Sequence, residues 1–509
     1  MGPAETQATL RGHLMRLGAD LGVLPASVVA AAAVEWALAR TPKGDRLVVA
    51  GDRLDIEKLT VVEGHRDARD GLSLIIGPVN GANAAALRAT LPWLRPRPVG
   101  LGASAGFGDR LGLATPGHVR ALRETGGTIT PIFAQQSIRE MTRTGRSPQA
   151  VIDDATWGAF EAGWTDGQGA DADHLKTPED ITACAEAGFT WFTIDPSEHV
   201  DERADVAGPA ELRAAWDALP WARLEDSPAS LRARFIDRTF DLEGHDVRLD
   251  EGRLVKAAVK YSLAVAHVAA MSRHIAGIMQ SRPWDLEVSV DETDAPTSHA
   301  EHVFIASELR RLGVRWLSLA PRFVGRFEKG VDYIGNVSAF DADIRVHAAI
   351  ARAFGPYKVS LHSGSDKFSI YEIAATHTRG LVHLKTAGTS YLEALRAVAR
   401  VSPELFRSVY AFSRGRYDED RASYHVSASV ASAPKPGDIA DADLSALLDD
   451  FHVRQILHVT FGSVLTARGG DGGLVYADPL RSILQAHPEA YAECLVRHFV
   501  RHLRPLADA

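Results

Sequence analysis

The middle of the chain alternates short apolar runs with longer amphipathic ones. The short runs have the length of buried strands, and the stretches between them have helical spacing. Eight strands are predicted: Pro98–Leu101, Ile129–Ala134, a short run ending near His174, Phe189–Ile194, Asp285–Val290, Val314–Ala320, Lys358–Leu361 and Leu381–Leu384. Eight strands, each followed by a helix, favour a closed (β/α)8 barrel of the TIM type, in the α/β class, over an open sheet.

Helix start and stop signals lie between these strands. Thr115-Pro116 and Thr177-Pro178 each predict a capping hydroxyl before a proline in the first turn. Residues 298–301 read as a capping box, and Gly313 would end the helix that it opens. Gly355-Pro356 predicts a helix end just before the seventh strand.

The proline-rich stretch 91–100 indicates a junction and divides the chain into three parts. We expect an N-terminal α/β extension over 1–97, a catalytic barrel over 98–400 and a mainly helical extension over 401–509. In the last part, "DADLSALLDDFHVRQILHVTF" is the clearest helical stretch. In the first part, the Ala-rich run 26–39 carries Glu35 and is too short to span a membrane, so it predicts a buried helix.

Composition narrows the function classes. The chain of 509 residues is 46% hydrophobic and 24% charged, which is ordinary for a globular protein. A net charge of −9 without a basic stripe gives no reason to expect nucleic acid. Two cysteines, Cys184 and Cys494, cannot form a disulfide framework, so we expect a reducing, cytoplasmic setting. The N-terminus lacks a signal-peptide pattern, and no membrane segment is expected.

Charged side chains follow nearly every predicted strand. In strand order they are Asp109 and Arg110; then Gln135, Gln136 and Ser137, which are polar; then Asp171, Asp173, His174 and Lys176; Asp195; Glu287, Asp291 and Glu292; Arg322; His362, Asp366 and Lys367; and His383 and Lys385. A barrel needs none of these for stability, because burying unpaired charge is costly. Since catalytic groups of such barrels collect at the C-terminal strand ends, the pattern predicts an active site there.

Imidazole and carboxylate side chains at converging strand ends suit a divalent metal. His174, Glu292 and His362 come from alternate strands, which contribute to one layer of the barrel. With 20 histidines in the chain, any single one is more often structural, and His347, His267 and His458 lie in apolar helical runs. His302 is a weaker candidate ligand, and the carboxylate of Asp332 could complete the set.

Two further signals concern the ligand. "HLKT" occurs at 174–177 and again at 383–386, which places a lysine near the mouth twice and indicates an anionic substrate. Gly100-x-Gly102-x-x-Ala105 formally matches a dinucleotide-binding loop, but four glycines and a proline follow before any helix. A nicotinamide cofactor is therefore not expected.

Six motifs together resemble the tagaturonate epimerases, also called tagaturonate/fructuronate epimerases. They are "GFGDRLGLATPGH", "GADADHLKT", "VSVDET", "SLAPRFVGRFEKGVDYIGN", "SLHSGSDKFSIYE" and "HLKTAGTSYLEALR". The resemblance covers residues 106–400 and, more loosely, both ends. It implies a metal-dependent TIM barrel that interconverts D-tagaturonate and D-fructuronate in hexuronate catabolism. It also implies that Asp173, His174, an acid of "VDET" and His362 lie in the site. Asn336 stands where the family pattern leads us to expect an acid.

The two uronates differ at C4, counting the ketone as C2, so simple enolisation cannot epimerise them. Retro-aldol cleavage between C3 and C4, rotation of the aldehyde and re-addition would do so, with a metal as Lewis acid. We expect Asp173 to accept the C4 hydroxyl proton and Glu292, or Asp291 in its place, to act on the opposite face.

The remaining predicted roles are these. The metal ligands are His174, Asp332 and His362, with His302 or His383 as alternatives to Asp332, and the ion is Zn, Mn, Co or Ni. Substrate would contact Asp109, Arg110, Arg322, Lys367, Lys385 and His383, with Arg110, Arg322, Lys367 and Lys385 competing for the C6 carboxylate.

Other functions fit the same strand ends. They are a metal-dependent uronate or sugar ketol-isomerase or aldolase, a metal-free glycosidase built on Glu292, and a non-catalytic sugar-binding barrel. The expected partner is a small ketouronate, and a homo-oligomer is compatible with the sequence.

Overall fold

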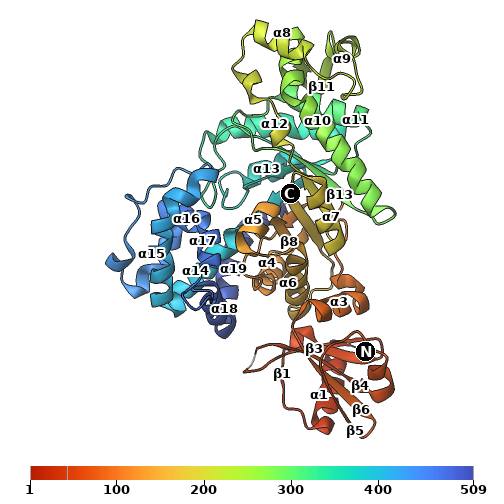
Figure 1. Cartoon of the computed structure of the whole chain (residues 1–509), viewed down its shortest axis with the longest axis vertical. Coiled ribbons are helices and arrows are strands. Elements are labelled where there is room, and N and C mark those ends of the chain that lie inside the picture. Colours follow the sequence, from red (N-terminus) through yellow and green to blue (C-terminus); the bar gives the residue numbers. More distant parts are fainter. Residues whose placement is uncertain (1, 43, 508–509) are drawn as a thin grey trace.

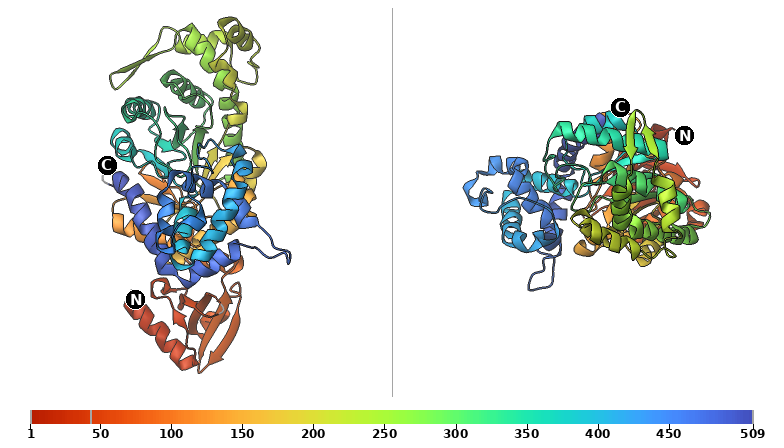
Figure 2. Two further views of the ribbon diagram at one scale, coloured as in Figure 1. Left: turned by 90° about the vertical axis from the view of Figure 1, so that its left-hand side faces the viewer. Right: turned by 90° about the horizontal axis from the view of Figure 1, so that it is seen from above.

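The computed structural model describes residues 2–42 and 44–507. An antiparallel sheet occupies one end of the long axis and is red in Figure 1. A closed barrel forms the middle, and an insertion from the barrel occupies the other end. The C-terminal helices form a lobe on one side of the barrel (Figures 1 and 2).

Eight parallel strands close the barrel. They are β7 (Ser104–Gly106), β8 (Thr130–Ser137), β9 (Gly169–Leu175), β10 (Trp191–Ile194), β13 (Asp285–Val290), β14 (Ser318–Pro321), β15 (Lys358–Leu361) and β16 (Val382–Lys385). Each pairs with the next along the chain, and β16 closes on β7. The predicted (β/α)8 fold is therefore confirmed.

Helices follow the strands and cover the barrel. They are α4 (Thr115–Thr125), α5 (Ile138–Thr144), α6 (Pro148–Glu161), α7 (Pro178–Ala187), α11 (His299–Arg311), α12 (Val337–Phe354), α13 (Tyr371–Thr378) and α14 (Thr389–Val401). The connection from β10 to β13 is an insertion that the sequence pattern did not reveal. It contains η3 (Ser197–His199), η4 (Glu202–Asp205), α8 (Pro209–Asp217), α9 (Pro228–Phe235), β11 (Thr239–Leu242), β12 (His245–Arg248) and α10 (Glu251–Met279).

Helix α10 is the one helix among the described residues that is long and apolar enough to cross a membrane. In its most apolar window of 18 residues, 72% is buried inside the protein. Helices in the core of globular proteins pass the same test of length and composition.

Strand prediction succeeded where polar and apolar residues alternate clearly and failed where small residues replace that pattern. β13 and β15 have the predicted bounds, whereas the first strand is Ser104–Gly106 and not Pro98–Leu101. Small residues hide this strand, because the barrel leaves no room there. A Cβ on Gly106 would lie 2.7 Å from Gln135 Cγ, and one on Gly108 would lie 2.6 Å from Ala387 Cα.

Some of the predicted helix-capping signals are confirmed, and one is wrong. Thr177 caps α7 as predicted, with Asp180 completing a capping box, and Ser298 forms the predicted capping box with Glu301. Thr115 is wrong as a cap: it is the first residue of α4, after Ala114, and no side chain caps that end. Helix α12 ends at Phe354, just before Gly355-Pro356, as predicted.

The N-terminal sheet is antiparallel throughout. Its strands are β1 (Gly22–Val23), β2 (Val29–Ala31), β3 (Val34–Arg40), β4 (Arg46–Asp52), β5 (His65–Arg69) and β6 (Leu72–Pro78), and its helices are α1 (Pro3–Leu17), η1 (Pro25–Ser27), α2 (Arg53–Glu57), α3 (Gly81–Thr90) and η2 (Pro92–Leu94). Helix α1 packs Leu10 and Leu14 on one face. The other face, with Trp36 and Val49, belongs to the same apolar core as the barrel.

The run 26–39 is not the predicted helix; it forms η1, the hairpin strand β2 and most of β3. Both faces of β3 are buried, so its sequence lacks the polar alternation of a half-exposed strand. Ala31 pairs with Val34, and the two loop residues Ala32 and Ala33 have φ of 51° and 63°. Positive φ at both positions is typical of a hairpin turn that usually contains Asn-Gly, and the alanines carry no such signal.

The C-terminal part is helical, as expected. Its elements are α15 (Pro403–Asp420), η5 (Arg421–Ser423), η6 (Pro436–Asp438), η7 (Asp441–Asp449), α16 (Phe451–Val459), α17 (Phe461–Thr466), α18 (Ala477–Ala486) and α19 (Pro488–Ala507). The clearest predicted helical stretch is divided at Asp450, which caps α16 through the Val453 amide. Helix α19 packs against α4 and α14. The divisions at 97/98 and 400/401 stay predictions.

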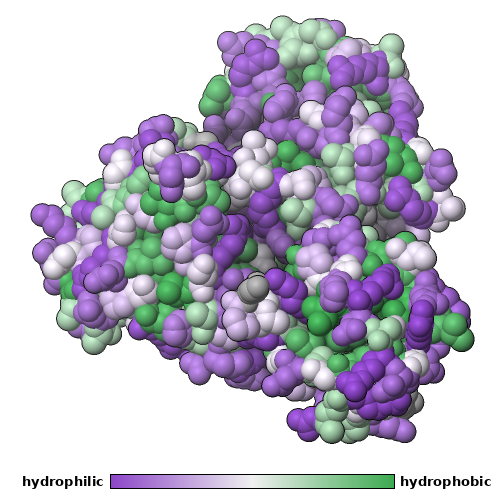
Figure 3. All heavy atoms as spheres, turned by 60° about the horizontal axis from the view of Figure 1, so that its bottom comes forward, coloured by the Kyte–Doolittle hydropathy of each residue, from purple (hydrophilic) through white to green (hydrophobic). Residues whose placement is uncertain are grey.

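Hydrophilic and hydrophobic residues are interspersed over the face drawn in Figure 3. Both cysteines are buried and free.

Candidate active site at the barrel mouth

The carboxyl ends of the barrel strands surround a cleft, which the C-terminal lobe partly covers. Its lining comes from the barrel and from beyond it: Arg110, Ser137, Arg139, Glu140, Asp173, His174, Lys329, His362, Ser363, Lys385, Ala387, Tyr424 and His458. A second cleft shares Arg139, His174, Lys329, Ser363 and Tyr424 with the first. The two clefts therefore form one continuous site, and Arg322, Asp291, Glu292 and His425 line its outer part.

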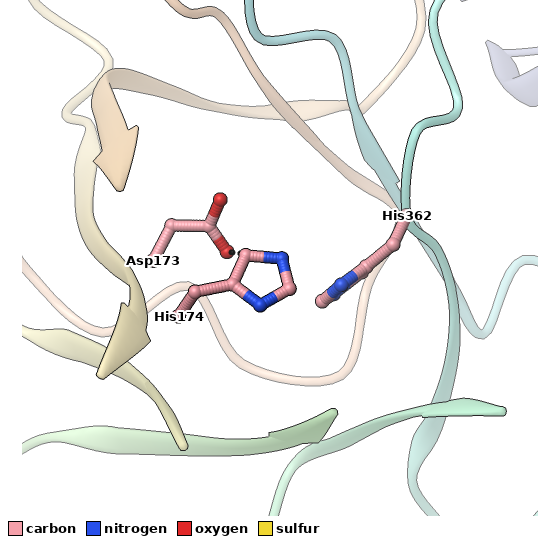
Figure 4. A group of neighbouring side chains, drawn as sticks. All are labelled: Asp173, His174 and His362. Carbon is pink, nitrogen blue, oxygen red and sulfur yellow. Dashed lines mark ion pairs between the residues drawn. The ribbon is translucent and has the colours of Figure 1, made fainter. Parts of the chain in front are cut away.

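Asp173, His174 and His362 converge in this site. One ligand atom from each lies within 4.8 Å of the others, and Figure 4 shows His362 facing the two β9 side chains from across the barrel. His174 has a φ of 52°. A left-handed conformation is uncommon for a residue other than glycine, and such residues cluster at functional sites.

Carboxylates behind the two imidazoles fix their orientation. Asp195 Oδ2 lies 3.2 Å from His174 Nδ1. His362 is held at both nitrogens, by Glu287 Oε1 at 2.7 Å and Asp291 Oδ1 at 3.0 Å. Although burial opposes it, these acids and Asp173 raise the pKa of His174 to about 10 and that of His362 to about 9. Carboxylates of this kind commonly support metal-binding histidines through the nitrogen that does not bind the metal, so a cation bound to His362 would replace one of its two contacts.

The donor set fits a divalent cation. Two imidazoles and a carboxylate are the ligands that Zn, Co and Ni accept readily, and Mn accepts the oxygen. The surrounding field is strongly negative, because Asp171, Asp195 and Glu287 are also buried here. Glu287 Oε2 is buried and has no hydrogen-bond partner within the described part of the chain. The field that raises the pKa of both histidines would equally attract a metal ion.

Lys385 is the centre of the layer beneath these histidines. Its Nζ lies 3.0 Å from Asp171 Oδ2, 2.6 Å from Asp173 Oδ1 and 2.7 Å from Glu287 Oε1. It also donates to Thr193 Oγ1 at 2.7 Å. Burial would lower the pKa of Lys385, but the three acids hold it above its usual value. This lysine is therefore committed to the protein's own acids.

Asp173 is a weak base in this setting. Burial would raise the pKa of its carboxyl group, but His174 and Lys385 together hold that pKa below the ordinary value. Burial raises the pKa of its neighbour Asp171 to about 7. A carboxylate that resists protonation suits a metal ligand better than a proton acceptor.

Three cationic side chains face the outer cleft. Arg139 pairs with Glu292 at 2.9 Å. Lys329 lies at the boundary of both clefts, and no described residue hydrogen-bonds or pairs with its amine; burial and then Arg139 lower its pKa. Arg322 lines the outer cleft, and its buried Nε has no partner among the described residues. Arg322 and Lys329 are thus available for an anionic ligand.

Four residues that were predicted to bind substrate or metal contact other parts of the protein instead. Lys367 Nζ donates to the carbonyls of Glu328 (2.8 Å), Val331 (2.5 Å) and Ser365 (3.0 Å). Asp332 is exposed and accepts from Ser369 Oγ at 2.9 Å. These two residues support the loops around the cleft, and neither lines it.

Asp109 and His383 also lie outside the cleft, whereas Arg110 lines it but already has partners in the protein. Asp109 accepts the amides of Leu111, Gly112 and Ala114. His383 lies inside the barrel, 2.9 Å from Ser104 Oγ, and burial lowers its pKa to about 3. Arg110 does line the cleft, but it pairs with Glu140 and its guanidinium lies 3.5 Å from the centre of the Phe461 ring.

Sequence reasoning missed Lys329, Arg139, Tyr424, His425 and His458 as lining residues. Lys329 lies in the loop singled out for Asp332, so a second charged residue in that loop was the available signal. Tyr424, His425 and His458 come from the C-terminal lobe. Only the packing of that lobe on the barrel brings them to the strand ends.

Known proteins share this fold and sequence over almost their whole length. A model of the tagaturonate epimerase family matches residues 25–506. The tagaturonate/fructuronate epimerase of Thermotoga maritima is 43% identical over 466 residues, which cover 92% of this chain and 93% of that protein. The native crystal structure of the fructuronate-tagaturonate epimerase UxaE of Cohnella laeviribosi is 35% identical, with a TM-score of 0.90 and 99% of each chain covered. A structure of the same protein with one glycerol gives the same values. The chain belongs to the tagaturonate epimerase family.

Proposed function

We propose that this protein interconverts D-tagaturonate and D-fructuronate by epimerisation at C4. The observation that carries the proposal is the layer of Asp173, His174 and His362 at the strand ends, in a chain whose relatives are named for this reaction. Cationic and acidic side chains in the adjoining outer cleft suit a substrate with hydroxyls and one carboxylate.

In this proposal, Asp173, His174 and His362 would hold the divalent cation. Asp173 thus takes the place expected of Asp332, because Asp332 is bound to Ser369 on the surface. When bound, the cation would act as a Lewis acid toward the substrate ketone and its neighbouring hydroxyl. Zn, Mn, Co and Ni all fit the donors.

Arg322 and Lys329 would orient the substrate from the outer cleft. The guanidinium of Arg322 can bind the C6 carboxylate with two parallel hydrogen bonds, which fixes its direction. Lys367 and Lys385 are excluded from that role by their own partners. The substrate would then lie with its carboxylate outward and its ketone toward His174 and His362.

Proton movement falls to Glu292 and Lys329. An oxygen of Glu292 lies within 4.8 Å of a His174 nitrogen, so it is placed to take the C4 hydroxyl proton. As that proton leaves, the C3–C4 bond breaks, C4 becomes an aldehyde and the electron pair passes into an enediolate over C2 and C3. After the aldehyde rotates and the bond re-forms, Lys329 returns a proton to the C4 oxygen. The reverse reaction exchanges the two roles.

The test is product analysis. Purified protein incubated with D-tagaturonate should give D-fructuronate, followed by proton NMR, and the same equilibrium mixture should form from either sugar. His362→Ala should abolish the reaction while leaving the circular dichroism spectrum unchanged. His377→Ala is a matched control, because His377 pairs with Asp341 and neither residue lines the two clefts. A folded wild-type protein that forms a different product would refute the proposal.

The expected cytoplasmic setting is retained in the proposal, and it rests on the two free, buried cysteines.

A further inference from the structure

A second group of side chains that could bind a metal ion lies between α11 and α12. His299 Nε2 is 3.1 Å and His347 Nε2 is 3.5 Å from the same oxygen, Asp343 Oδ1. One ligand atom from each of the three residues lies within 4.8 Å of the others. None of them lines the clefts at the barrel mouth.

The other ring nitrogen of His347, Nδ1, already has a partner. It lies 2.8 Å from His302 Nδ1, and His302 Nε2 lies 2.8 Å from the Tyr357 hydroxyl. His347 is fully buried, and its Nε2 faces Asp343 Oδ1 at 3.5 Å, at the limit of a hydrogen bond. A buried imidazole with one nitrogen anchored and the other turned toward a carboxylate is an arrangement that metal-binding histidines have.

The backbone favours a joint donor set. Asp343 and His347 are four residues apart on α12, so both side chains lie on one helix face. His299 opens α11, and its side chain is 34% exposed. It also lines a cleft beside the inserted hairpin, which gives an ion a path from solvent. Two imidazoles and a carboxylate with an open side match the ligand sets of zinc.

We propose that His299, Asp343 and His347 form a second divalent-metal site, selective for zinc-like ions and separate from the barrel mouth. The other oxygen, Asp343 Oδ2, accepts the Val324 amide at 3.2 Å. Val324 lies two residues beyond Arg322, whose amide donates to Thr297. An ion bound to Asp343 would therefore fix the loop that presents Arg322 to the outer cleft.

The experiment is zinc titration by isothermal calorimetry in a variant without the barrel donors. The double variant His174→Ala, His362→Ala should bind one zinc ion per chain. Adding His299→Asn should weaken that binding by more than the roughly 10- to 100-fold that loss of an outer-shell partner causes. Adding His377→Asn should leave zinc binding unchanged. His377 pairs with Asp341, which lies on α12 with Asp343 and His347 but does not belong to the group. The design separates this site from the barrel site, which the double variant lacks.

Zinc anomalous diffraction on wild-type crystals gives a reading that does not depend on the double variant folding. A peak bounded by His299, Asp343 and His347 is the expected result. No peak at these residues in zinc-soaked crystals would overturn the proposal. Zinc binding that is absent from the folded double variant, or that survives His299→Asn unchanged, would overturn it too.

Discussion

Replacing Lys385 by methionine tests whether the acidic layer beneath the histidines depends on one ammonium. The side chain is 3% exposed and its Nζ contacts three carboxylates at 2.6 to 3.0 Å. At an effective dielectric constant near 20, unit charges 4 Å apart attract by about 4 kcal/mol, so the two fully ionised partners, Asp173 and Glu287, give roughly 8 kcal/mol or more before desolvation. Desolvation of the four groups offsets most of that sum. Removing one partner of a buried ion pair typically costs about 3–5 kcal/mol, and we expect that loss here.

The assay is thermal unfolding of wild type and Lys385→Met at several pH values. At roughly 2 °C per kcal/mol for a large domain, the melting temperature should fall by about 6–10 °C at neutral pH. The matched control is Lys256→Met. Lys256 is 38% exposed, and its partner Asp205 keeps Lys260 at 2.7 Å. A partly exposed pair of this kind is worth about 0–1 kcal/mol.

The electrostatic account also predicts how the stability loss of Lys385→Met changes with pH. Without Lys385, the pKa values of Asp173 and Glu287 should rise above those of the unfolded chain, as that of Asp171 already does, to about 7. A carboxyl group with a raised folded pKa contributes stability at low pH and loses it as pH rises through that pKa. The deficit of Lys385→Met should therefore be smallest near pH 4–5 and grow up to about pH 7 and beyond. A constant or shrinking deficit, or a melting temperature equal to that of Lys256→Met, would refute the electrostatic account.

Further predictions concern the cleft. Dialysis against a strong chelator should abolish activity, and Zn, Mn, Co or Ni should restore it. Full activity after exhaustive chelation would show that the reaction does not need a metal ion. Arg322→Lys should raise KM by about 10-fold or more, equivalent to about 1.4 kcal/mol, by losing a bidentate contact, with little change in kcat; an effect on kcat alone would contradict that role. Glu292→Gln and Lys329→Met should each lower kcat by about 10²- to 10⁴-fold, the range for lost acid–base groups; unchanged kcat in either variant would reassign the proton transfer.

The sequence predicts the barrel well because its signal is local. Asp285–Val290 and Lys358–Leu361 alternate polar and apolar residues between helices with capping signals, and their bounds were recovered. The strand Ser104–Gly106 was misplaced because close packing demands small residues, which give no apolar signal. The hairpin at 29–40 was mistaken for a helix because alanines occupy both its turn and its buried faces.

The candidate site was predictable only to the level of strand ends. His174 and His362 could be selected from their positions, and the structure brings them together. Which charges face the substrate depends on contacts between distant segments. Lys367 looked available in the sequence, yet three carbonyls from two loops surround its amine. Tyr424 lines the cleft because the C-terminal lobe packs on the barrel, and no local pattern encodes that contact.

The central claim is that carbon–carbon cleavage inverts C4 while its hydrogen stays in place. The most direct measurement uses D-tagaturonate deuterated at C4, with the product analysed by NMR and the rate compared with that of the unlabelled sugar. The account predicts D-fructuronate that retains all the deuterium at C4, formed without a primary isotope effect. Loss of deuterium to solvent, or a primary isotope effect from breaking the C4–H bond, would contradict it.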